Sequence, residues 1–310
     1  MANTISIDNA HWHSKLSGEL DKMIVAKAAT GFFGDGGFGA KFQGTKTVLI
    51  DDVEMDGLGK YDRATGFPKG AVKINQTPYE LTMERGTTFT IDRLDAEETG
   101  IDNLPGKLGG NAGEFVRTQV VPEVDAYGLS KLFAIAKDNE QLVGGGVALK
   151  GNKTAGILTD AINAVSDAYG EDEDLIAFCD SAFHADLMNT TEFTRKLDIS
   201  DFKKGEIDTK VKSLNGCKII KVPTARMKSE YVFKVGGEQN FGFAAAEGAT
   251  NVGCIVLPRK IVHRVMRVQK CRFWTPDQNI DMDAYKLDFR FVYDFLIKQS
   301  VRGCIFAYTY

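Results

Sequence analysis

The 310-residue chain has few cysteines, and their arrangement does not suggest disulfides. The five are odd in number and widely scattered, mostly within apolar runs such as IAFC and CIVL; they are Cys179, Cys217, Cys254, Cys271 and Cys304. Small secreted domains stabilised by disulfides instead carry even numbers of cysteines at short spacings. We therefore expect reduced, buried thiols in a protein made in a reducing cytoplasm.

The sequence also lacks a membrane-spanning run and an amino-terminal signal pattern. The apolar stretch around Phe243–Leu257 is interrupted by Glu247 and is shorter than a bilayer requires. The first residues, MANTISIDNAHWHSKLSG, contain no basic segment followed by an apolar one. These absences predict a protein that stays in solution and has no membrane partner.

A strong excess of basic residues, which is typical of dedicated nucleic-acid binders, is absent as well. The formal net charge is -4, and 43% of the residues are hydrophobic, which fits one large or two smaller globular domains. From Arg259 onward, however, ten basic residues oppose five acidic ones, a local charge of +5. We interpret these charges as solvated strand faces.

No phosphate-binding or metal-binding motif is convincing. Gly146–Thr154 nearly fits a phosphate loop, but the extra Asn152 displaces the lysine from its usual place, so we interpret the segment as a surface connector. His11 and His13 could share one side of an extended chain, but no third ligand lies near them in the sequence. The acidic groups lack the spacing of a calcium-binding loop and fit solvated turns. We expect no cofactor and no metal.

One pair of residues faintly resembles a nucleophile and its base. Cys179 and His184 lie close together between a predicted strand and a predicted helix. Because Cys179 follows the apolar run LIAF, a buried thiol is the simpler interpretation. We therefore predict that the protein is not an enzyme and has no catalytic residues, and we keep a cytosolic Cys/His hydrolase as a remote alternative.

What the sequence does contain is a long amphipathic segment, Gly113–Ala136, which predicts one helix. From Asn111 to Asp138 it would extend roughly 40 Å. Its polar positions, Asp125 among them, are expected on the rest of the cylinder, and Pro122 should bend it. The apolar positions, mostly three or four residues apart, share one face: Val116, Val120, Val124, Tyr127, Leu132 and Ile135.

The segment before this helix, from about Lys46 to Glu97, predicts a two-stranded ribbon with polar faces. Its strands are expected at Thr45–Val53, Ala71–Asn75 and Leu81–Asp92, with a turn-rich stretch between the first two. An isolated hairpin of this kind is only marginally stable in water. Its stability must come from a partner or a neighbouring copy.

The remaining sequence predicts a mixture of helices and short strands. Ser17–Ala29 is expected to be a helix with Ser17 as its N-cap, followed by a glycine-rich segment too flexible for a regular element. Further helices are expected at Ala155–Ala168 and Ser181–Asn189, the latter opened by Ser181. Strands are expected at Asp174–Cys179, Gly205–Leu214, Cys217–Val222, Tyr231–Val235, Val252–Leu257, Val262–Trp274, Met282–Leu296 and Cys304–Tyr308, the last three paired with each other under the long helix.

Three segments together resemble the major capsid proteins of tailed phages, which have the Hong Kong 97 phage-type fold. GKYDRATGFPKGAVKIN with YELTMERGTTFTIDRLDAEETG is similar to that family's extended loop and its returning strand. NAGEFVRTQVVPEVDAYGLSKLFAIA is similar to its spine helix. The course from VPTARMKSEYVFKVGG to the carboxy-terminal CIFAYTY resembles the late strands of its peripheral domain. The likeness covers the chain from about residue 40.

The resemblance implies an α+β fold of four parts. These are an N-terminal arm (1–44), an extended β-loop (45–100), a peripheral domain (101–154 and 253–310) with the spine helix at about 111–138 and a closing sheet, and an axial domain (155–252). It implies a head-shell subunit that assembles as pentamers and hexamers into an icosahedral shell. A related alternative is the shell protein of an encapsulin-like bacterial nanocompartment.

The resemblance also implies partners and a location. The shell would enclose packaged double-stranded DNA and contact it non-specifically, and scaffolding, portal and decoration proteins are the other expected partners. The protein would be located in the virion and assembled in the cytoplasm of a bacterial host. Some relatives crosslink a loop lysine to a neighbour's asparagine, but no such asparagine can be matched here, so we expect no crosslink. The candidate assembly residues are Lys60, Tyr61, Arg63, Phe67, Lys69, Arg85, Arg93, Arg117 and Glu123.

Overall fold

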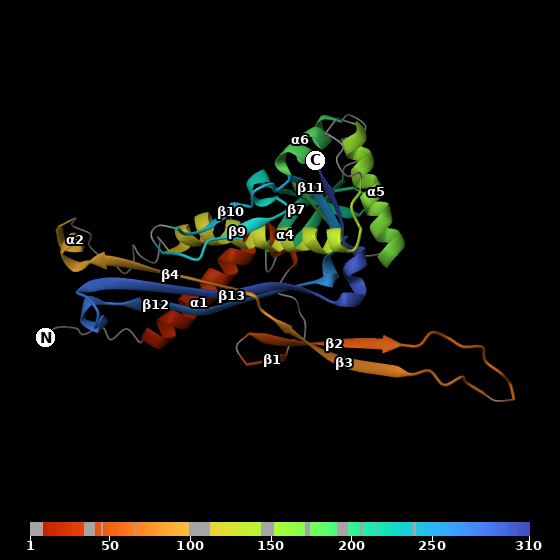
Figure 1. The fold of residues 1–310 in the computed structure, drawn as a ribbon, viewed down its shortest axis with the longest axis horizontal. Helices are drawn as coiled ribbons and strands as arrows, with labels where there is room; N and C mark the ends of the chain where they lie inside the picture. The colour runs from red at the N-terminus through yellow and green to blue at the C-terminus, as the bar shows by residue number, and fades with distance from the viewer. Residues whose placement is uncertain are drawn as a thin grey trace.

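A long body, a lobe above one of its ends and a ribbon that projects away from it make up the molecule (Figure 1). The computed structural model describes residues 9–33, 41–44, 46–64, 66–98, 112–143, 152–170, 174–190, 198–204, 207–214, 216–237 and 240–310. Within this part of the chain, no helix is long and apolar enough to cross a membrane.

The lobe is built on a six-stranded sheet in the order β14-β11-β5-β8-β7-β6. α5 (Asn152–Tyr169) and α6 (Ser181–Asn189) contribute to the apolar core on one face of this sheet, and α4 (Val121–Asp138) to the core on the other. The strands are β5 (Leu175–Asp180), β6 (Asp198–Lys204), β7 (Ile207–Leu214), β8 (Cys217–Val222), β11 (Val252–Pro258) and β14 (Phe306–Thr309).

The long body contains a three-stranded antiparallel sheet in the order β12-β13-β4. Its strands are β12 (Val262–Trp274), β13 (Ala284–Ile297) and β4 (Met83–Asp92). The inward-facing aromatic residues of β13 share the largest apolar core with α4 and α1 (Asn9–Lys27). α4 therefore lies between the sheet of the body and the sheet of the lobe, and it joins the two (Figure 1).

The ribbon consists of β2 (Thr47–Met55) and β3 (Val72–Glu80), paired from Thr47↔Glu80 to Met55↔Val72. The short β1 (Lys41–Gln43) pairs with the base of β2. A second hairpin, β9 (Tyr231–Phe233) with β10 (Phe243–Ala245), lies along α4. The short helical turns are α2 (Arg93–Glu98), Ala29–Phe33, Thr224–Arg226, Arg259–Ile261, Pro276–Gln278 and Gln299–Cys304.

Two strand pairings differ from the sequence-based predictions. β4 leaves the ribbon and pairs with β13, from Met83↔Tyr293 to Asp92↔Ala284, because Leu81 just before it is buried in the body. β14 pairs with β11 and not with β12 or β13. Both sides of this strand are apolar: Ala307, with Ile305 just before the strand, faces one core, while Phe306 and Tyr308 face the other. The strand therefore belongs inside the two-sided lobe.

The predicted long helix is confirmed over Ala112–Asp138, with one wide turn. Val116–Val120 is π-helical, and the Val121 N–H donates to the Val116 carbonyl. Pro122, which has no N–H to donate, then falls in the first turn of α4, where it is tolerated. The bend that we expect at this proline stays a prediction.

The prediction that Asp125 lies on the polar side of this helix is wrong. Its carboxylate is completely buried and accepts hydrogen bonds from the Ala29 N–H at 3.0 Å and from the Thr30 N–H and hydroxyl, each at 2.9 Å. Arg226 pairs with the same carboxylate at 3.0 Å. Asp125 therefore caps the turn Ala29–Phe33 from a distant part of the chain, which satisfies N–H groups that the turn cannot pair itself.

Several local predictions are also corrected. α1 begins at Asn9, so Ser17 lies within it, and the glycine-rich segment after it opens with the buried turn Ala29–Phe33. α6 is capped by Asp180, which accepts from the Phe183 N–H, and not by Ser181. Outside the described residues lie the His11 and His13 side chains, the connector 144–151, the acidic residues 171–173 and Asn215.

Gly128 of α4 provides a test of how closely the helix packs on β13. A Cβ built there would lie 2.7 Å from two ring atoms of Phe295, whereas one at Gly156 of α5 meets nothing within 4 Å. Gly128→Ala should therefore destabilise the fold by about 1–3 kcal/mol, because over-packing outweighs the gain in helix propensity. Gly156→Ala should stabilise it by about 0.5–1 kcal/mol. Urea unfolding followed by circular dichroism measures both, and equal effects would refute the close packing.

Candidate assembly interface

The ribbon ends in a long tip, residues 56–71, that is closed at its base by backbone contacts. The Asp56 N–H donates to the Ala71 carbonyl at 3.1 Å, and the Ala71 N–H donates to the Asp56 carboxylate at 2.8 Å. Further out, Asp62 and Gly66 exchange two backbone hydrogen bonds, with Gly66 at φ 82°, a conformation that favours glycine. The tip thus has a defined shape but no apolar core.

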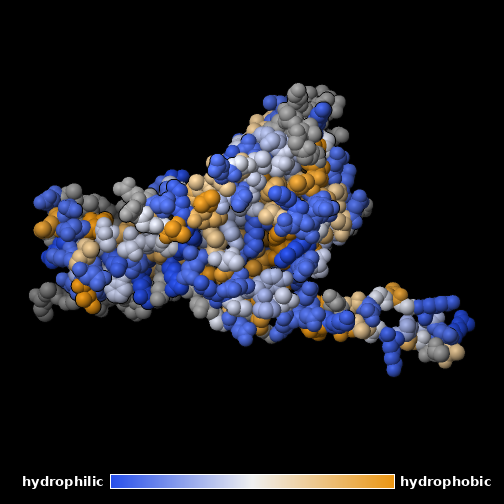
Figure 2. Space-filling model, in the orientation of Figure 1, coloured by the Kyte–Doolittle hydropathy of each residue, from blue (hydrophilic) through white to orange (hydrophobic). Residues whose placement is uncertain are grey.

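Large apolar side chains of this tip face water. Leu58 is fully exposed, Phe67 is 86% exposed, and the Phe67 ring contacts the Tyr61 ring at 5.0 Å between centroids. On the face of the ribbon drawn in Figure 2, hydrophobic residues lie among hydrophilic ones. Exposed apolar clusters beside polar groups mark surfaces that bind other proteins.

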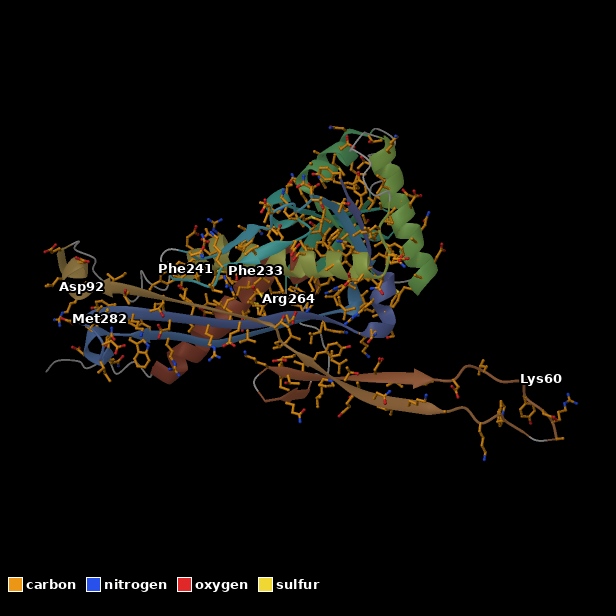
Figure 3. The ribbon with its side chains drawn as sticks, in the orientation of Figure 1. Lys60, Asp92, Phe233, Phe241, Arg264 and Met282 are labelled. Atoms are coloured by element: carbon orange, nitrogen blue, oxygen red, sulfur yellow. The ribbon has the colours of Figure 1, made fainter. Side chains whose placement is uncertain are left out.

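Three of the predicted assembly residues are basic side chains of the same tip. Lys60, Arg63 and Lys69 are exposed, and none of them pairs with an acidic side chain within the part of the chain described. Lys60 lies far out on the ribbon in Figure 3. These charges are therefore available to another molecule.

Two other predicted assembly residues, Arg85 and Glu123, bind each other inside the subunit. Arg85 Nε donates to Glu123 at 2.6 Å, and its other nitrogens donate to the carbonyls of Lys234 at 2.6 Å and Gly242 at 3.1 Å. The pair lines a cavity of about 470 Å³ to which five aromatic residues also contribute. Its geometry shows that it joins β4, α4 and the β9–β10 hairpin; an assembly role for it stays a prediction.

The last two, Arg93 and Arg117, have local partners. Arg117 pairs with Glu114 one turn earlier, and its hydrogen bonds lower the pKa of that carboxyl. Arg93 lies 4.0 Å from the Asp283 carboxylate, and its N–H donates to the Asp283 carbonyl. Both arginine side chains remain about half exposed. Their roles in assembly also stay predictions.

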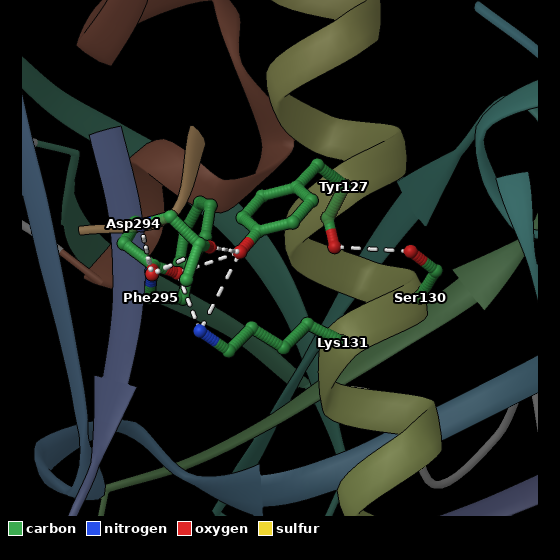
Figure 4. A network of polar contacts seen from close by, with 6 residues as sticks. Tyr127, Ser130, Lys131, Asp294 and Phe295 are labelled. Atoms are coloured by element: carbon green, nitrogen blue, oxygen red, sulfur yellow. Dashed lines mark hydrogen bonds and ion pairs between the residues drawn. The ribbon is translucent and has the colours of Figure 1, made fainter. Parts of the chain in front are cut away.

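A buried carboxylate, Asp294 of β13, fixes the base of the ribbon where β3 passes into β4 (Figure 4). The Thr82 N–H and hydroxyl each donate to it at 3.1 Å, and the Tyr127 hydroxyl donates at 2.8 Å. Lys131 Nζ pairs with it at 2.5 Å, and the Phe295 N–H donates to it at 2.7 Å. Burial, and next the nearby Asp294 charge, raise the pKa of Tyr127, so its hydroxyl stays a donor. Five contacts, from Thr82, from two residues of α4 and from Phe295, thus meet at one carboxylate.

Two smaller sets of contacts also stabilise the base of the ribbon. Leu81 packs in a separate small core with residues of β2 and β13: Val48, Ile50, Val292 and Leu296. Glu84 pairs with Lys46 at 2.5 Å and with Arg290, and these cations lower the pKa of its carboxyl. Lys298 Nζ donates to the Asp51 carbonyl at 2.7 Å. The base of the ribbon is therefore held firmly, in contrast to its tip.

Sequence reasoning missed Asp294, although the sequence carries a signal for it. The residue is the single charge within the apolar run FVYDFLI of β13. An acidic side chain inside a strand that is buried on both faces needs donors, because an unpaired buried charge costs several kcal/mol. The signal identifies the buried carboxylate but not its partners, which come from residues 82, 127 and 131.

The Cys179 thiol lies at the centre of the lobe. Cys179 is completely buried, and burial, with a further contribution from Cys254, raises the pKa of its thiol well above the ordinary value. A neutral, inaccessible thiol is a poor nucleophile. Among the described residues, no group of His, Cys, Asp or Glu side chains is arranged to hold a metal ion.

Comparison with known proteins identifies the fold. No family model and no curated protein matches the chain. Solved structures do: the capsid of the cyanophage P-SCSP1u is 13% identical, with a TM-score of 0.55 over 87% of this chain and 84% of that one. The mature capsid of bacteriophage PhiM1 is 11% identical, with a TM-score of 0.51 over 86% and 82%. A virus-like particle from Pyrococcus furiosus is 8% identical, with a TM-score of 0.51 over 96% and 99%. The chain has the Hong Kong 97 phage-type capsid fold, as expected.

Substitutions of Asp294 and of the residues that donate to it (the Asp294 network) should lower stability to different extents. Asp294→Ala leaves Lys131, Tyr127 and Thr82 without their acceptor and should cost about 3–5 kcal/mol. Lys131→Met keeps the other donors and should cost less, about 1.5–3 kcal/mol. Asp138→Ala, at an exposed site on the same helix, should change stability by less than about 0.5 kcal/mol. Urea unfolding measures all three, and a loss no larger for Asp294→Ala than for Asp138→Ala would contradict the role of the network.

His263 predicts a loss of stability in mild acid. Burial, and next the Lys298 charge, lower the pKa of this histidine from 6.5 to about 4, so below pH 6.5 the unfolded chain binds a proton that the folded chain does not. Folding stability should therefore fall as the pH drops from 6.5 to about 4. The slope should be less than about 1.4 kcal/mol per pH unit, because the folded and unfolded states differ by less than one proton at this histidine.

His263→Gln provides the control for this pH effect, because it removes the titrating group and leaves every carboxylate in place. Thermal unfolding of both proteins across this pH range should show a shallower decline in the variant. Parallel curves would refute the effect.

Proposed function

We propose that this chain is the major shell subunit of a tailed-phage head, which assembles as pentamers and hexamers into an icosahedral shell around double-stranded DNA. The observation that carries the proposal is the capsid fold together with a ribbon whose tip has no core of its own. The exposed apolar side chains of this tip, such as Leu58 and Phe67, gain stability only when another surface covers them, and a neighbouring copy would provide that surface.

The charge of the chain supports enclosure of DNA without tight binding. Each phosphate contact made by a basic residue adds affinity, so a shell with a strongly basic inner surface would hold its genome firmly. The net charge of -4 fits a container that contacts DNA non-specifically. Location in the virion, assembly in the host cytoplasm and the scaffolding, portal and decoration partners belong to the same proposal and rest on the resemblance.

We propose no catalytic role. The one nucleophile that the sequence suggested, Cys179, is buried and protonated, so the hydrolase alternative has no support in the geometry. The candidate assembly residues at the tip are Lys60, Tyr61, Arg63, Phe67 and Lys69, and they share exposure and the absence of a local core.

A second candidate is the shell of a bacterial nanocompartment that holds protein cargo. The similarity to the Pyrococcus furiosus virus-like particle, which spans 96% of this chain, favours this alternative. The contents of purified particles distinguish the two functions. Packaged DNA, with terminase and portal genes beside the coding gene, supports the phage head; an enzyme cargo encoded nearby supports the compartment.

The proposal predicts assembly, and it predicts which segment assembly needs. The purified protein, alone or with added scaffold, should form rings, tubes or closed shells in electron micrographs and by light scattering. Replacement of residues 57–70 with Asn-Gly, between the hydrogen-bonded Asp56 and Ala71, should leave a folded subunit that closes no shells.

Two results would contradict this prediction. A protein that stays monomeric under all assembly conditions would overturn the shell function. If the shortened variant loses its circular dichroism signal or its unfolding transition, the tip belongs to a folding core and not to an interface. The Gly156→Ala protein, altered at an open site on α5, serves as the matched control that should still assemble.

A further inference from the structure

Two of the five cysteines lie directly opposite each other in the sheet of the lobe. β5 and β11 are neighbouring antiparallel strands, and their register places Cys254 opposite Cys179. Both thiols are free, completely buried and part of the same apolar core, to which α5 and α6 contribute. Residues that face each other in an antiparallel sheet carry their side chains on the same side, so these two thiols are neighbours.

The hydrogen-bond pattern of the two strands favours a bond between these thiols. The Arg259 N–H donates to the Asp174 carbonyl, so these two residues form a hydrogen-bonded pair at the end of the ladder. Hydrogen-bonded and non-hydrogen-bonded pairs alternate, and Cys254 is five residues from Arg259, so Cys254 and Cys179 form a non-hydrogen-bonded pair. Pro258, which has no N–H, fits the same alternation. In such pairs the Cα atoms are about 4.5 Å apart, within the range of about 4.4–6.8 Å that disulfides span.

The pair also lies where the sheet can open. Cys254 with Cys179 is the last pair of the β5–β11 ladder at the amino-terminal end of β11. On the other side of β11, the register with β14 shifts between Val252 and Cys254. A shift of this kind interrupts the ladder locally. The end of β11 can therefore separate from β5, and expose both thiols, without unfolding of the whole lobe.

The other cysteines are placed differently. Cys217 is buried in the same core, but it lies on β8, where the register with β5 puts it level with Leu175, four residues from Cys179. Cys271 and Cys304 belong to the other, larger core. Among the five cysteines, all within the part of the chain that the structure describes, one pair therefore lies face to face.

We propose that Cys179 and Cys254 form a disulfide in the folded subunit once it meets a low-molecular-weight disulfide such as oxidised glutathione. One cysteine thiolate attacks the glutathione disulfide, which gives a mixed disulfide and releases one glutathione. The second cysteine thiolate then attacks the sulfur of the first cysteine and releases the other glutathione. The two cysteine protons end on the two glutathione thiols, so oxidised glutathione is reduced as the two cysteines are oxidised. The bond links β5 to β11 inside the lobe.

The same burial determines when this bond forms. It raises the pKa of both thiols, and the thiolate is the reactive form, so the bond forms slowly and through the opened ladder. A reducing cytoplasm keeps such thiols reduced. Under the proposed shell function, on which this step alone rests, the disulfide would thus be absent during folding and assembly and would form in released particles.

Thiol labelling of the folded protein tests the proposal. Wild-type protein is incubated with oxidised glutathione, checked for folding by circular dichroism, then denatured and treated with N-ethylmaleimide. Mass spectrometry should find a single chain with three labels, whereas protein kept reduced carries one on each of its five cysteines. Trypsin should release the peptide of Cys179 joined to that of Cys254. Five labels, bound glutathione without this link, or a link through another cysteine would overturn the proposal.

Two variants provide a matched comparison, because each removes one completely buried thiol from the same core. Cys217→Ala should still form the link, so that two of its four thiols escape labelling. Cys254→Ala should keep all four thiols free under the same conditions. Equal loss of labels in the two variants would contradict the pairing. If either variant does not fold, the peptides of the wild-type protein still decide.

The bond should also stabilise the subunit. It closes residues 180–253 into a loop in the unfolded chain, so the equilibrium constant for unfolding should be at least about a hundredfold lower in the oxidised protein than in the reduced one. Urea unfolding measures both forms, and Cys254→Ala should show no difference after the same treatment. Equal stability of the two wild-type forms would refute a link between β5 and β11. These measurements use the free subunit, so they test the disulfide whether or not shells assemble.

Discussion

The architecture depends on how a ribbon without a core is attached to a body that has one. A two-stranded ribbon gains little from its own packing, so its direction is set where β3 passes into β4. There the buried Asp294 binds Thr82 from the ribbon side and Tyr127 and Lys131 from α4, all at 3.1 Å or less. A buried carboxylate with this many donors is stable only in one arrangement, because any displaced donor leaves charge unpaired. The network therefore fixes the direction in which the ribbon leaves the body, in addition to stabilising the fold.

The same logic extends along α4. Asp125 caps the turn Ala29–Phe33, Glu123 holds Arg85 of β4, and Gly128 lets the helix approach Phe295 closely. The π-helical turn precedes Pro122, so the missing hydrogen bond falls where the helix is already irregular. Because these contacts recur along one helix that lies between the two sheets, α4 fixes the position of the lobe relative to the base of the ribbon.

The sequence predicts element types well and pairings less well, for a physical reason. Periodicity reports which face of a segment is buried, and it located α4, β2, β8 and β12 to within a few residues. It cannot report which distant donor meets a buried acid, so Asp125 was expected at the surface. The pairing partner of a strand likewise depends on single buried residues. Leu81, just before β4, is buried beside β13, with which β4 then pairs. At the tip, by contrast, Lys60, Phe67 and Lys69 are exposed, and their role in assembly stays a prediction.

The proposed shell function would place separate demands on the two ends of the ribbon. Rings of five and of six need slightly different rotations between neighbours, and a head-to-tail contact closes only when the rotation fits. A base fixed by a buried carboxylate cannot supply that variation. Exposed lysine and arginine side chains could, since an ion pair in water tolerates a shift of its partner at little energetic cost. Under the proposed shell function, the division between a rigid base and a charged, core-free tip fits the requirement that one chain occupy several environments.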